Sequence, residues 1–149
     1  METATTEEVK FLGITSEQID AIWGEVKPFI ERSLKYANGE LDQDDVYRFL
    51  KERAMQLWVL LTMPDQKITM CGVTEIVNYP RKKVCRVVLM GGIPSQEWRD
   101  NVHNIETWAK GQGCSTMEAC VRKGIAKVMA EQDYKKVYTI VSKELENAI

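Results

Sequence analysis

The first part of the chain carries apolar residues at the spacing of amphipathic helices. After a short polar leader, Thr15 or Ser16 stands at the expected start of a helix. The apolar stripe that follows has helical periodicity and consists of Ile19, Ile22, Trp23, Val26, Phe29, Ile30 and Leu34. Pro28 lies inside the stripe, so we expect the helix to bend or to restart there. Asn38-Gly39 predicts the end of this segment.

A second helix is predicted from Leu41 onward. Acidic side chains at Asp42, Asp44 and Asp45 are favoured near the positive N-terminus of a helix. The inner face of this helix is formed by Val46, Phe49 and Leu50. Residues 1–54 are therefore predicted to form a helical N-terminal part.

From Met55 the pattern changes from helical periodicity to short apolar runs bounded by turn residues. The runs are Leu57 to Leu61, Ile68 to Val77 and Lys83 to Met90, and each predicts a strand. A hairpin centred on Pro80 and Arg81 would place Glu75 opposite Arg86, an opposite-charge cross-strand pair that favours this register. The same register pairs Val77 with Val84, Val73 with Val88, Cys71 with Met90, Ile76 with Cys85, Thr74 with Val87 and Gly72 with Leu89.

The remainder of the chain alternates between helix and strand. A break at Gly91 to Ser95 precedes a helix carrying Trp98, Val102, Ile105 and Ala109, which Gly111 and Gly113 end. Further candidates are a strand from Cys114 to Val121, a helix from Lys123 to Glu131 and a final strand from Tyr134 to Ser142. The elements follow in the order helices, strand meander and β-α-β-α-β tail. This order predicts an α/β domain with a mixed β-sheet covered by helices on both faces. We expect one domain, residues 1–149, with the sheet in residues 55–145.

Composition narrows the classes of protein. The 149 residues are 44% hydrophobic and 28% charged with a net charge of −2, which is ordinary globular usage and gives no general attraction to nucleic acid. No apolar run is long enough to cross a bilayer and the first residues are acidic, so we expect a cytoplasmic protein. The four cysteines form no C-x-x-C pair and lie far from the single histidine, His103, so no metal site is expected.

The order of elements resembles that of the GNAT N-acetyltransferase superfamily from Leu57 to Leu145. The stretch Ile105 to Cys114 is similar to the family's helix that ends in a glycine before a strand. Arg122 to Tyr134 resembles its short helix before a glycine-aromatic turn and a final strand. The chain also resembles GNAT-like proteins of tailed phages and prophages, some of them labelled internal virion proteins. The resemblance implies a GNAT-like fold, acetyl-CoA as cofactor and an amine as acceptor.

In the family, acetyl-CoA lies where two parallel strands separate, and a [Q/R]-x-x-G-x-[G/A] loop binds its pyrophosphate. The residues of this chain at the corresponding place, and therefore the candidate cofactor-binding residues, are Leu89, Met90, Gly91, Gly92, Ile93 and Ser95. Backbone N–H groups at a helix N-terminus are the donors that such an anion needs. Here the glycines come too early, no basic residue is in the loop, Pro94 removes a donor and Glu97 adds negative charge. The glycine pair can equally be an ordinary turn.

The family's catalytic residues are also incompletely matched. Met129 occupies the position of the tyrosine that protonates the departing thiolate, and a thioether has no proton to donate. Tyr134 is the nearby alternative, although it aligns with a core aromatic. Glu75 is the candidate general base, with an ion pair to Arg86 as the structural alternative. His103 is a further candidate base, with a surface position as its alternative.

Two functions follow from these observations. The first is acetyl-CoA-dependent N-acetyltransfer to an unidentified amine, with activity weakened or lost by the departures from the family's motifs. The second is a non-catalytic GNAT-like scaffold that acts as a phage virion component or binds a host protein. No nucleic-acid or membrane partner is expected. The only basic cluster on a predicted turn is Arg81, Lys82 and Lys83, at the tip of the hairpin.

Overall fold

The computed structural model describes residues 8–92, 96–121 and 123–146. The elements follow in the order β1 Glu8–Ile14, the 3₁₀ helix η1 Ser16–Gln18, α1 Ile19–Leu34, α2 Gln43–Lys51, β2 Met55–Met63, β3 Lys67–Asn78, β4 Lys83–Gly91, α3 Gln96–Gly111, β5 Thr116–Ala119 and α4 Lys123–Ala130. Contacts divide the chain into two units, one ending at Ala119 and one beginning at Cys120, and each is described by itself. The prediction of one domain stays a prediction.

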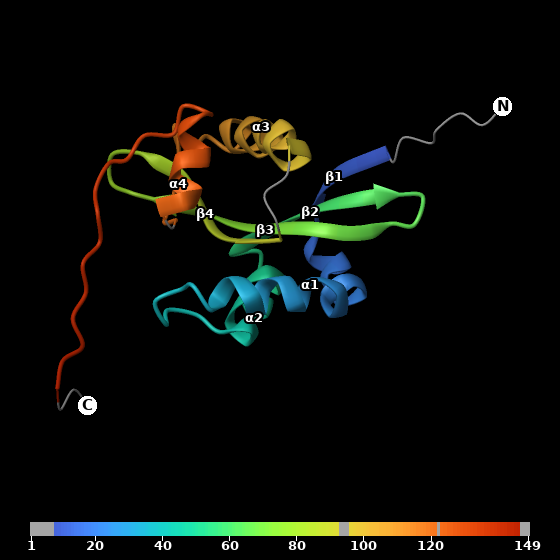
Figure 1. Ribbon diagram of the computed structural model, residues 1–149, viewed down its shortest axis with the longest axis horizontal. Coiled ribbons are helices and arrows are strands. Elements are labelled where there is room, and N and C mark those ends of the chain that lie inside the picture. Colours follow the sequence, from blue (N-terminus) through green and yellow to red (C-terminus); the bar gives the residue numbers. More distant parts are fainter. Residues whose placement is uncertain (1–7, 93–95, 122, 147–149) are drawn as a thin grey trace. The chain divides into compact units, whose positions relative to one another are not determined.

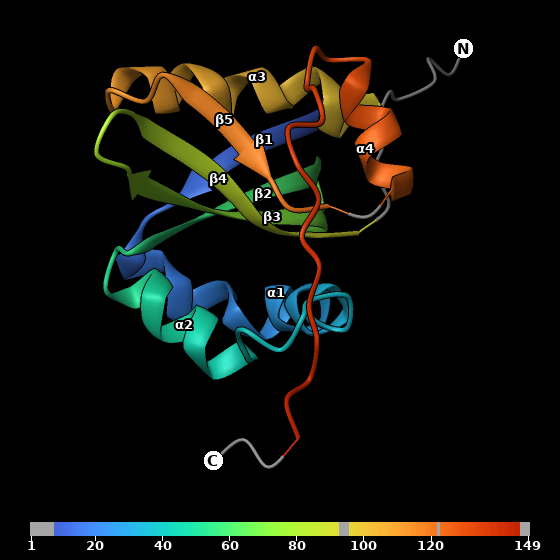
Figure 2. The ribbon, with the colours of Figure 1, turned by 90° about the vertical axis from the view of Figure 1, so that its left-hand side faces the viewer.

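The first unit is built around one mixed sheet. The five strands lie in the order β1-β2-β3-β4-β5, antiparallel except for the parallel pair β4 and β5. Helices α1 and α2 lie on one side of the sheet and α3 lies on the other, as Figures 1 and 2 show. This arrangement confirms the predicted mixed α/β fold with helices on both faces.

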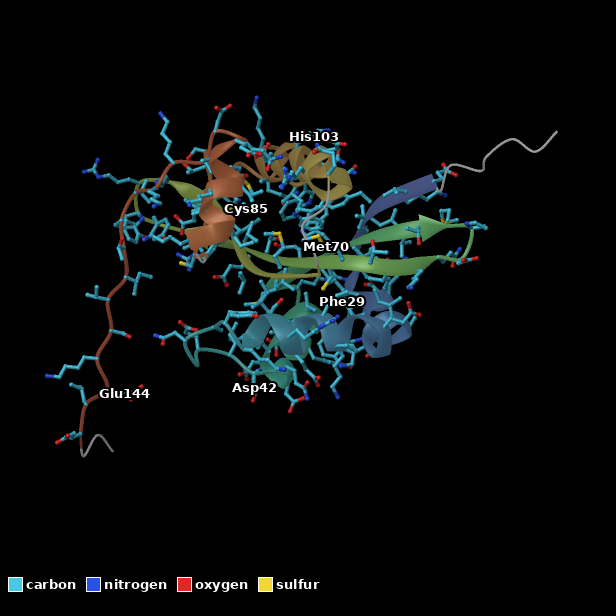
Figure 3. The ribbon with its side chains drawn as sticks, in the orientation of Figure 1. Phe29, Asp42, Met70, Cys85, His103 and Glu144 are labelled. Atoms are coloured by element: carbon cyan, nitrogen blue, oxygen red, sulfur yellow. The ribbon has the colours of Figure 1, made fainter. Side chains whose placement is uncertain are left out.

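Each face of the sheet carries its own apolar core. The core under α1 and α2 includes Ile19, Val26, Ile30, Val46, Leu50, Leu57 and Val73, and Phe29 packs against it. The core under α3 includes Trp58, Met70, Cys85, Trp98 and Ile105 (Figure 3). In the second core the rings of Phe11, Trp58, Trp98 and Trp108 form a chain of contacts with centroids 5.3–5.8 Å apart. Both faces of the central strands are therefore removed from water.

Side-chain caps lie at the starts of η1 and α2. The Thr15 N–H donates to the Gln18 side chain at 3.0 Å at the start of η1, which leads directly into α1. At α2, the Asp45 N–H donates to Asp42 at 2.8 Å and the Asp42 N–H donates to Asp45 at 3.0 Å, so the two residues cap each other. Helix α1 runs through Pro28 without a restart, which corrects one of the two expectations. Its apolar stripe stays on one face of the helix and is buried on the sheet, which holds the segment together.

Strand β1 was not predicted, because its apolar–polar alternation is short and is broken by the successive apolar residues Phe11 and Leu12. The strand pairs antiparallel with β2 from Glu8 opposite Met63 to Ile14 opposite Leu57. Phe11 stacks on the Trp58 ring, and a side chain at Gly13 would come within 3.1 Å of the same ring. Pairing with β2 and packing on Trp58, both of them distant in sequence, therefore stabilise this strand.

The hairpin register is confirmed near the turn and shifts by one residue farther out. Glu75 lies opposite Arg86, and Val77, Ile76 and Thr74 also have their predicted partners. Beyond a bulge, Val73 pairs with Leu89, Gly72 with Met90 and Cys71 with Gly91, so the three outer predicted pairs were wrong. The bulge places Val88 and Leu89 in succession against the core under α1 and α2, which a regular strand would not do.

The second unit contains α4, which confirms the helix predicted from Lys123. The strand predicted from Tyr134 to Ser142 was wrong, because these residues are extended but pair with no strand of the described chain. Without a neighbouring strand, the alternating side chains gain no hydrogen-bonded ladder. Among the described residues, no helix has the length and apolar character needed to cross a membrane.

Candidate cofactor and catalytic site

The pairing between the two parallel strands ends in the middle of β4, at the point where β5 itself ends. Strand β5 pairs with β4 from Val84 opposite Thr116 to Val87 opposite Ala119. Strand β4 continues to Gly91, so Val88, Leu89 and Met90 lie beyond the last β5 pair (Figure 2). The bulge begins at the same point. In the described part of the chain, no strand pairs with this side of β4 beyond Val87.

This stretch of β4 presents its backbone outward and its side chains inward. Leu89 is buried in the core under α1 and α2, and Met90 packs against the core under α3. The Met90 carbonyl accepts a hydrogen bond of 2.7 Å from the Ser33 hydroxyl of α1, which ties the end of the strand to that helix. A ligand along β4 would therefore meet main-chain N–H and C=O groups.

The glycine pair has a packing explanation. A side-chain carbon at Gly91 would lie 2.6 Å from the Phe29 carbonyl oxygen, so only glycine lets α1 approach this closely. Gly92 has φ +109°, and a side chain there would lie 2.8 Å from the Thr69 carbonyl oxygen. Close packing therefore explains Gly91 at the end of β4, and a positive φ together with close packing explains Gly92, while their role as anion donors stays a prediction. Ile93 and Ser95, the other loop candidates, lie outside the described residues.

Before the β4–β5 pairing ends, a charged cluster crosses β3, β4 and β5. Arg86 donates to Glu75 at 3.3 Å and to Glu118 at 2.9 Å and 2.7 Å. Its second terminal nitrogen also donates to the Tyr79 hydroxyl at 2.6 Å, and this hydroxyl donates to Glu118 at 3.1 Å. The predicted Glu75–Arg86 pair is confirmed, and it forms one half of a larger cluster.

The side chains of this cluster are partly buried. Burial of the guanidinium acts to lower the pKa of Arg86, but the hydrogen bond to Glu118 and the electrostatic attraction of Tyr79, Glu118 and Glu75 raise it overall. Arg86 is therefore a permanent cation beside Glu75. The Glu75 carboxylate already accepts a hydrogen bond from this cation at 3.3 Å. Glu118 was not identified from the sequence, because the register between the parallel strands β4 and β5 cannot be recognised in the local sequence of either strand.

The three candidate catalytic residues lie on different parts of the chain. Glu75 is in the sheet, whereas His103 is exposed on α3 (Figure 3). Tyr134 belongs to the second unit, where it is half-buried and its N–H donates to the Met129 carbonyl at 3.2 Å. The structure joins Glu75 to Arg86 and Glu118 and does not join it to His103. The catalytic roles of Glu75, His103 and Tyr134 stay predictions.

No group of histidine, cysteine, aspartate and glutamate suited to a metal ion occurs among the described residues. Cys71 and Cys85 are buried, and burial raises the pKa of Cys71 to about 12 and that of Cys85 to about 11. Both thiols therefore stay protonated at neutral pH. A role for either as a thiolate nucleophile is disfavoured.

Solved structures with the same arrangement are acetyltransferases. The aminoglycoside N-acetyltransferase AAC(6')-Iy in complex with CoA has a TM-score of 0.68 at 11% identity, over 97% of this chain and 99% of that one. The chain adopts the GNAT acetyltransferase fold. A putative acetyl transferase from Pyrococcus furiosus has a TM-score of 0.67 at 15% identity, over 93% of this chain and 100% of that one. A predicted acetyltransferase from Clostridium acetobutylicum, solved with acetyl-CoA, has a TM-score of 0.66 at 9% identity, over 92% and 96%.

At these identities the likeness shows the GNAT fold alone. No protein-family model matches the sequence, and no curated protein matches it significantly. The solved structures support the GNAT fold that the resemblance implied and give no support to a phage or prophage relationship. The end of the β4–β5 pairing at Val87 and Ala119 is therefore the feature from which a function has to be argued.

Proposed function

We propose that this chain binds acetyl-CoA along the free side of β4 and transfers its acetyl group to an amine. The observation that carries the proposal is the end of the β4–β5 pairing at Val87 and Ala119, immediately before a bulge. Two of the structures with this fold contain CoA or acetyl-CoA. An extended ligand with amide groups can add to a strand edge as another strand would.

The backbone of β4 suits the pantetheine arm of acetyl-CoA, whereas the loop that follows β4 does not suit the phosphates. The main chain at Val88, Leu89 and Met90 can donate to and accept from the amide groups of the pantetheine arm, and a bulge N–H can stabilise negative charge on the thioester carbonyl. The sequence from Gly91 to Glu97 contains no lysine or arginine to neutralise the phosphates. We therefore expect the pantetheine arm to supply most of the binding free energy and the phosphates little of it, with a dissociation constant for acetyl-CoA in the high micromolar range.

The chemistry requires two proton transfers for which the chain is poorly equipped. The amine nitrogen attacks the thioester carbonyl, the C–N bond forms, the C–S bond breaks, and a proton moves from the nitrogen to the sulfur. Glu75 is the candidate that would take this proton, but its carboxylate is paired with Arg86. Met129 has no proton to return to the sulfur. We therefore expect slow turnover.

Hydrogen exchange with and without acetyl-CoA tests the binding site directly. We expect slower exchange at the amides of Val88 to Met90 with millimolar acetyl-CoA, and no change in β1 as an internal control. Calorimetry should show binding that weakens with salt and strengthens in Glu97→Gln, because that substitution removes a negative charge at the start of α3, next to the loop in sequence. Unchanged exchange in β4 at millimolar acetyl-CoA would overturn the proposal.

Turnover is measured separately, by chromatographic detection of free CoA with a panel of primary amines. A chromatographic readout avoids reaction of a thiol reagent with the protein's own cysteines. A second candidate function, a GNAT scaffold that binds without catalysing, is favoured by the pairing of Glu75 with Arg86. Protection of β4 without release of CoA above the uncatalysed rate would select this second function.

A further inference from the structure

Strand β5 is joined to β4 over a short length. The strand spans Thr116–Ala119 and pairs with β4 at four positions, whereas β3 and β4 pair at eight (Figure 2). Parallel pairing is also slightly less stable per residue than antiparallel pairing. The attachment of β5 to β4 therefore depends more on side-chain contacts than the attachment of β3 does.

Arg86 links β4 to β5 near the end of this pairing. It lies directly opposite Glu118, and the next pair, Val87 with Ala119, is the last one. The Arg86 Nε and Nη2 groups donate to one Glu118 oxygen at 2.9 Å and 2.7 Å, which is the length of charge-assisted hydrogen bonds. The bond from Nη1 to Glu75 on β3 is longer, at 3.3 Å. Arg86 therefore binds β5 more tightly than it binds β3.

A contact from the β3–β4 turn reinforces this link. The Tyr79 hydroxyl accepts a hydrogen bond of 2.6 Å from Arg86 and donates to the same Glu118 oxygen at 3.1 Å. One carboxylate oxygen of β5 thus accepts two donors from β4 and one from the turn. Three donors on one oxygen fix the orientation of the Glu118 side chain. The chain is therefore anchored one residue before β5 ends.

We infer that Arg86 and Glu118 are positioning residues, which keep the end of β5 in register and so fix the length of β4 that stays free for acetyl-CoA. The free stretch, Val88 to Met90, begins two residues after Arg86, at the bulge. Without the ion pair, the last two pairs of this short ladder would open more often. The part of the inference that concerns the ligand rests on the proposed function, whereas the anchoring of β5 does not.

Hydrogen exchange of the full chain without ligand tests the anchoring. Glu118→Gln and Glu75→Gln are a matched pair, because each removes one negative charge and one ion-pair partner of Arg86, and only Glu118 belongs to β5. We expect the amides of residues 116–119 to exchange about 5- to 10-fold faster in Glu118→Gln, and within about twofold of wild type in Glu75→Gln. Circular dichroism should show that both variants are folded. Equal exchange of β5 in the two variants would overturn the inference.

Titration with acetyl-CoA, followed by the NMR shifts of backbone amides, tests the positioning. Removal of a negative charge by itself strengthens the binding of an anionic ligand in both variants. We nevertheless expect the dissociation constant to rise about 3- to 10-fold in Glu118→Gln and not to rise in Glu75→Gln. Faster exchange of β5 with an unchanged or lower dissociation constant in Glu118→Gln would overturn the positioning role.

A wild-type chain without shift changes at millimolar acetyl-CoA would refute the proposed function and, with it, the positioning role. That failure is distinguishable from failure of the ion pair, because it shows in the wild-type titration, whereas failure of the ion pair shows in the exchange of Glu118→Gln measured without ligand.

Discussion

Replacing Thr74 by valine should destabilise the protein through one buried hydrogen bond. Thr74 is fully buried on β3, and its hydroxyl accepts a hydrogen bond of 3.0 Å from the Trp58 indole N–H. The same hydroxyl donates to the Gln56 side-chain oxygen at 2.9 Å. Valine has nearly the same shape, so Thr74→Val removes the hydroxyl without opening a cavity.

The two broken hydrogen bonds differ in cost. Trp58 is 7% exposed, so its N–H has little access to water, and an unsatisfied buried donor costs about 1–3 kcal/mol. Gln56 is half-buried and its oxygen can turn toward water, which makes that loss smaller. The added methyl group offsets part of the cost, by up to about 0.8 kcal/mol. We expect a net loss of about 1–2 kcal/mol in the free energy of unfolding.

Denaturant unfolding followed by tryptophan fluorescence and circular dichroism measures this difference. The midpoint should fall without a change in slope, and Tm should drop by about 2–8 °C in a chain of this length. Thr69→Val is the matched control, since Thr69 is an exposed threonine on the same strand whose hydroxyl makes a 3.4 Å contact with the Leu60 carbonyl. Equal stability of Thr74→Val and wild type, or an equal loss in the control, would refute the reasoning.

Three further predictions concern charge, reactivity and packing. Glu75→Gln should lose only about 0–1 kcal/mol, because Arg86 keeps both bonds to Glu118; a larger loss than in Glu118→Gln would contradict this. At pH 8, iodoacetamide should label the exposed Cys120 readily and leave Cys71 and Cys85 unlabelled until the protein unfolds, because their raised pKa values keep them as thiols; mass spectrometry of timed samples would show early labelling of Cys71 if this is wrong. Gly91→Ala should cost about 1–3 kcal/mol through its clash with Phe29, whereas Gly24→Ala, in open space on α1, should stabilise by about 0.5–1 kcal/mol; similar Tm values for the two variants would disprove the packing explanation.

Elements with strong local signals were predictable from the sequence. Apolar periodicity predicted α1, α2, the three central strands and α3. In the structure each of these elements buries the apolar side chains that the periodicity identified. The register near the hairpin turn was also predictable, since Glu75 and Arg86 favour each other across the strands. Of the candidate site, the sequence placed Glu75 beside Arg86 and the glycine pair at the end of β4.

Features that depend on distant partners were decided only by the tertiary structure. Strand β1 is stabilised by β2 and Trp58, and the bulge arises where β4 packs two successive residues against the core under α1 and α2. Glu118 joins Arg86 only because β5 lies parallel to β4, and parallel register leaves no mark in the local sequence. The segment from Tyr134 to Ser142 has the alternation of a strand and yet pairs with none in the described chain. Apolar–polar alternation indicates which side chains a strand would bury. The strand itself forms only where its backbone can hydrogen-bond to a neighbouring strand.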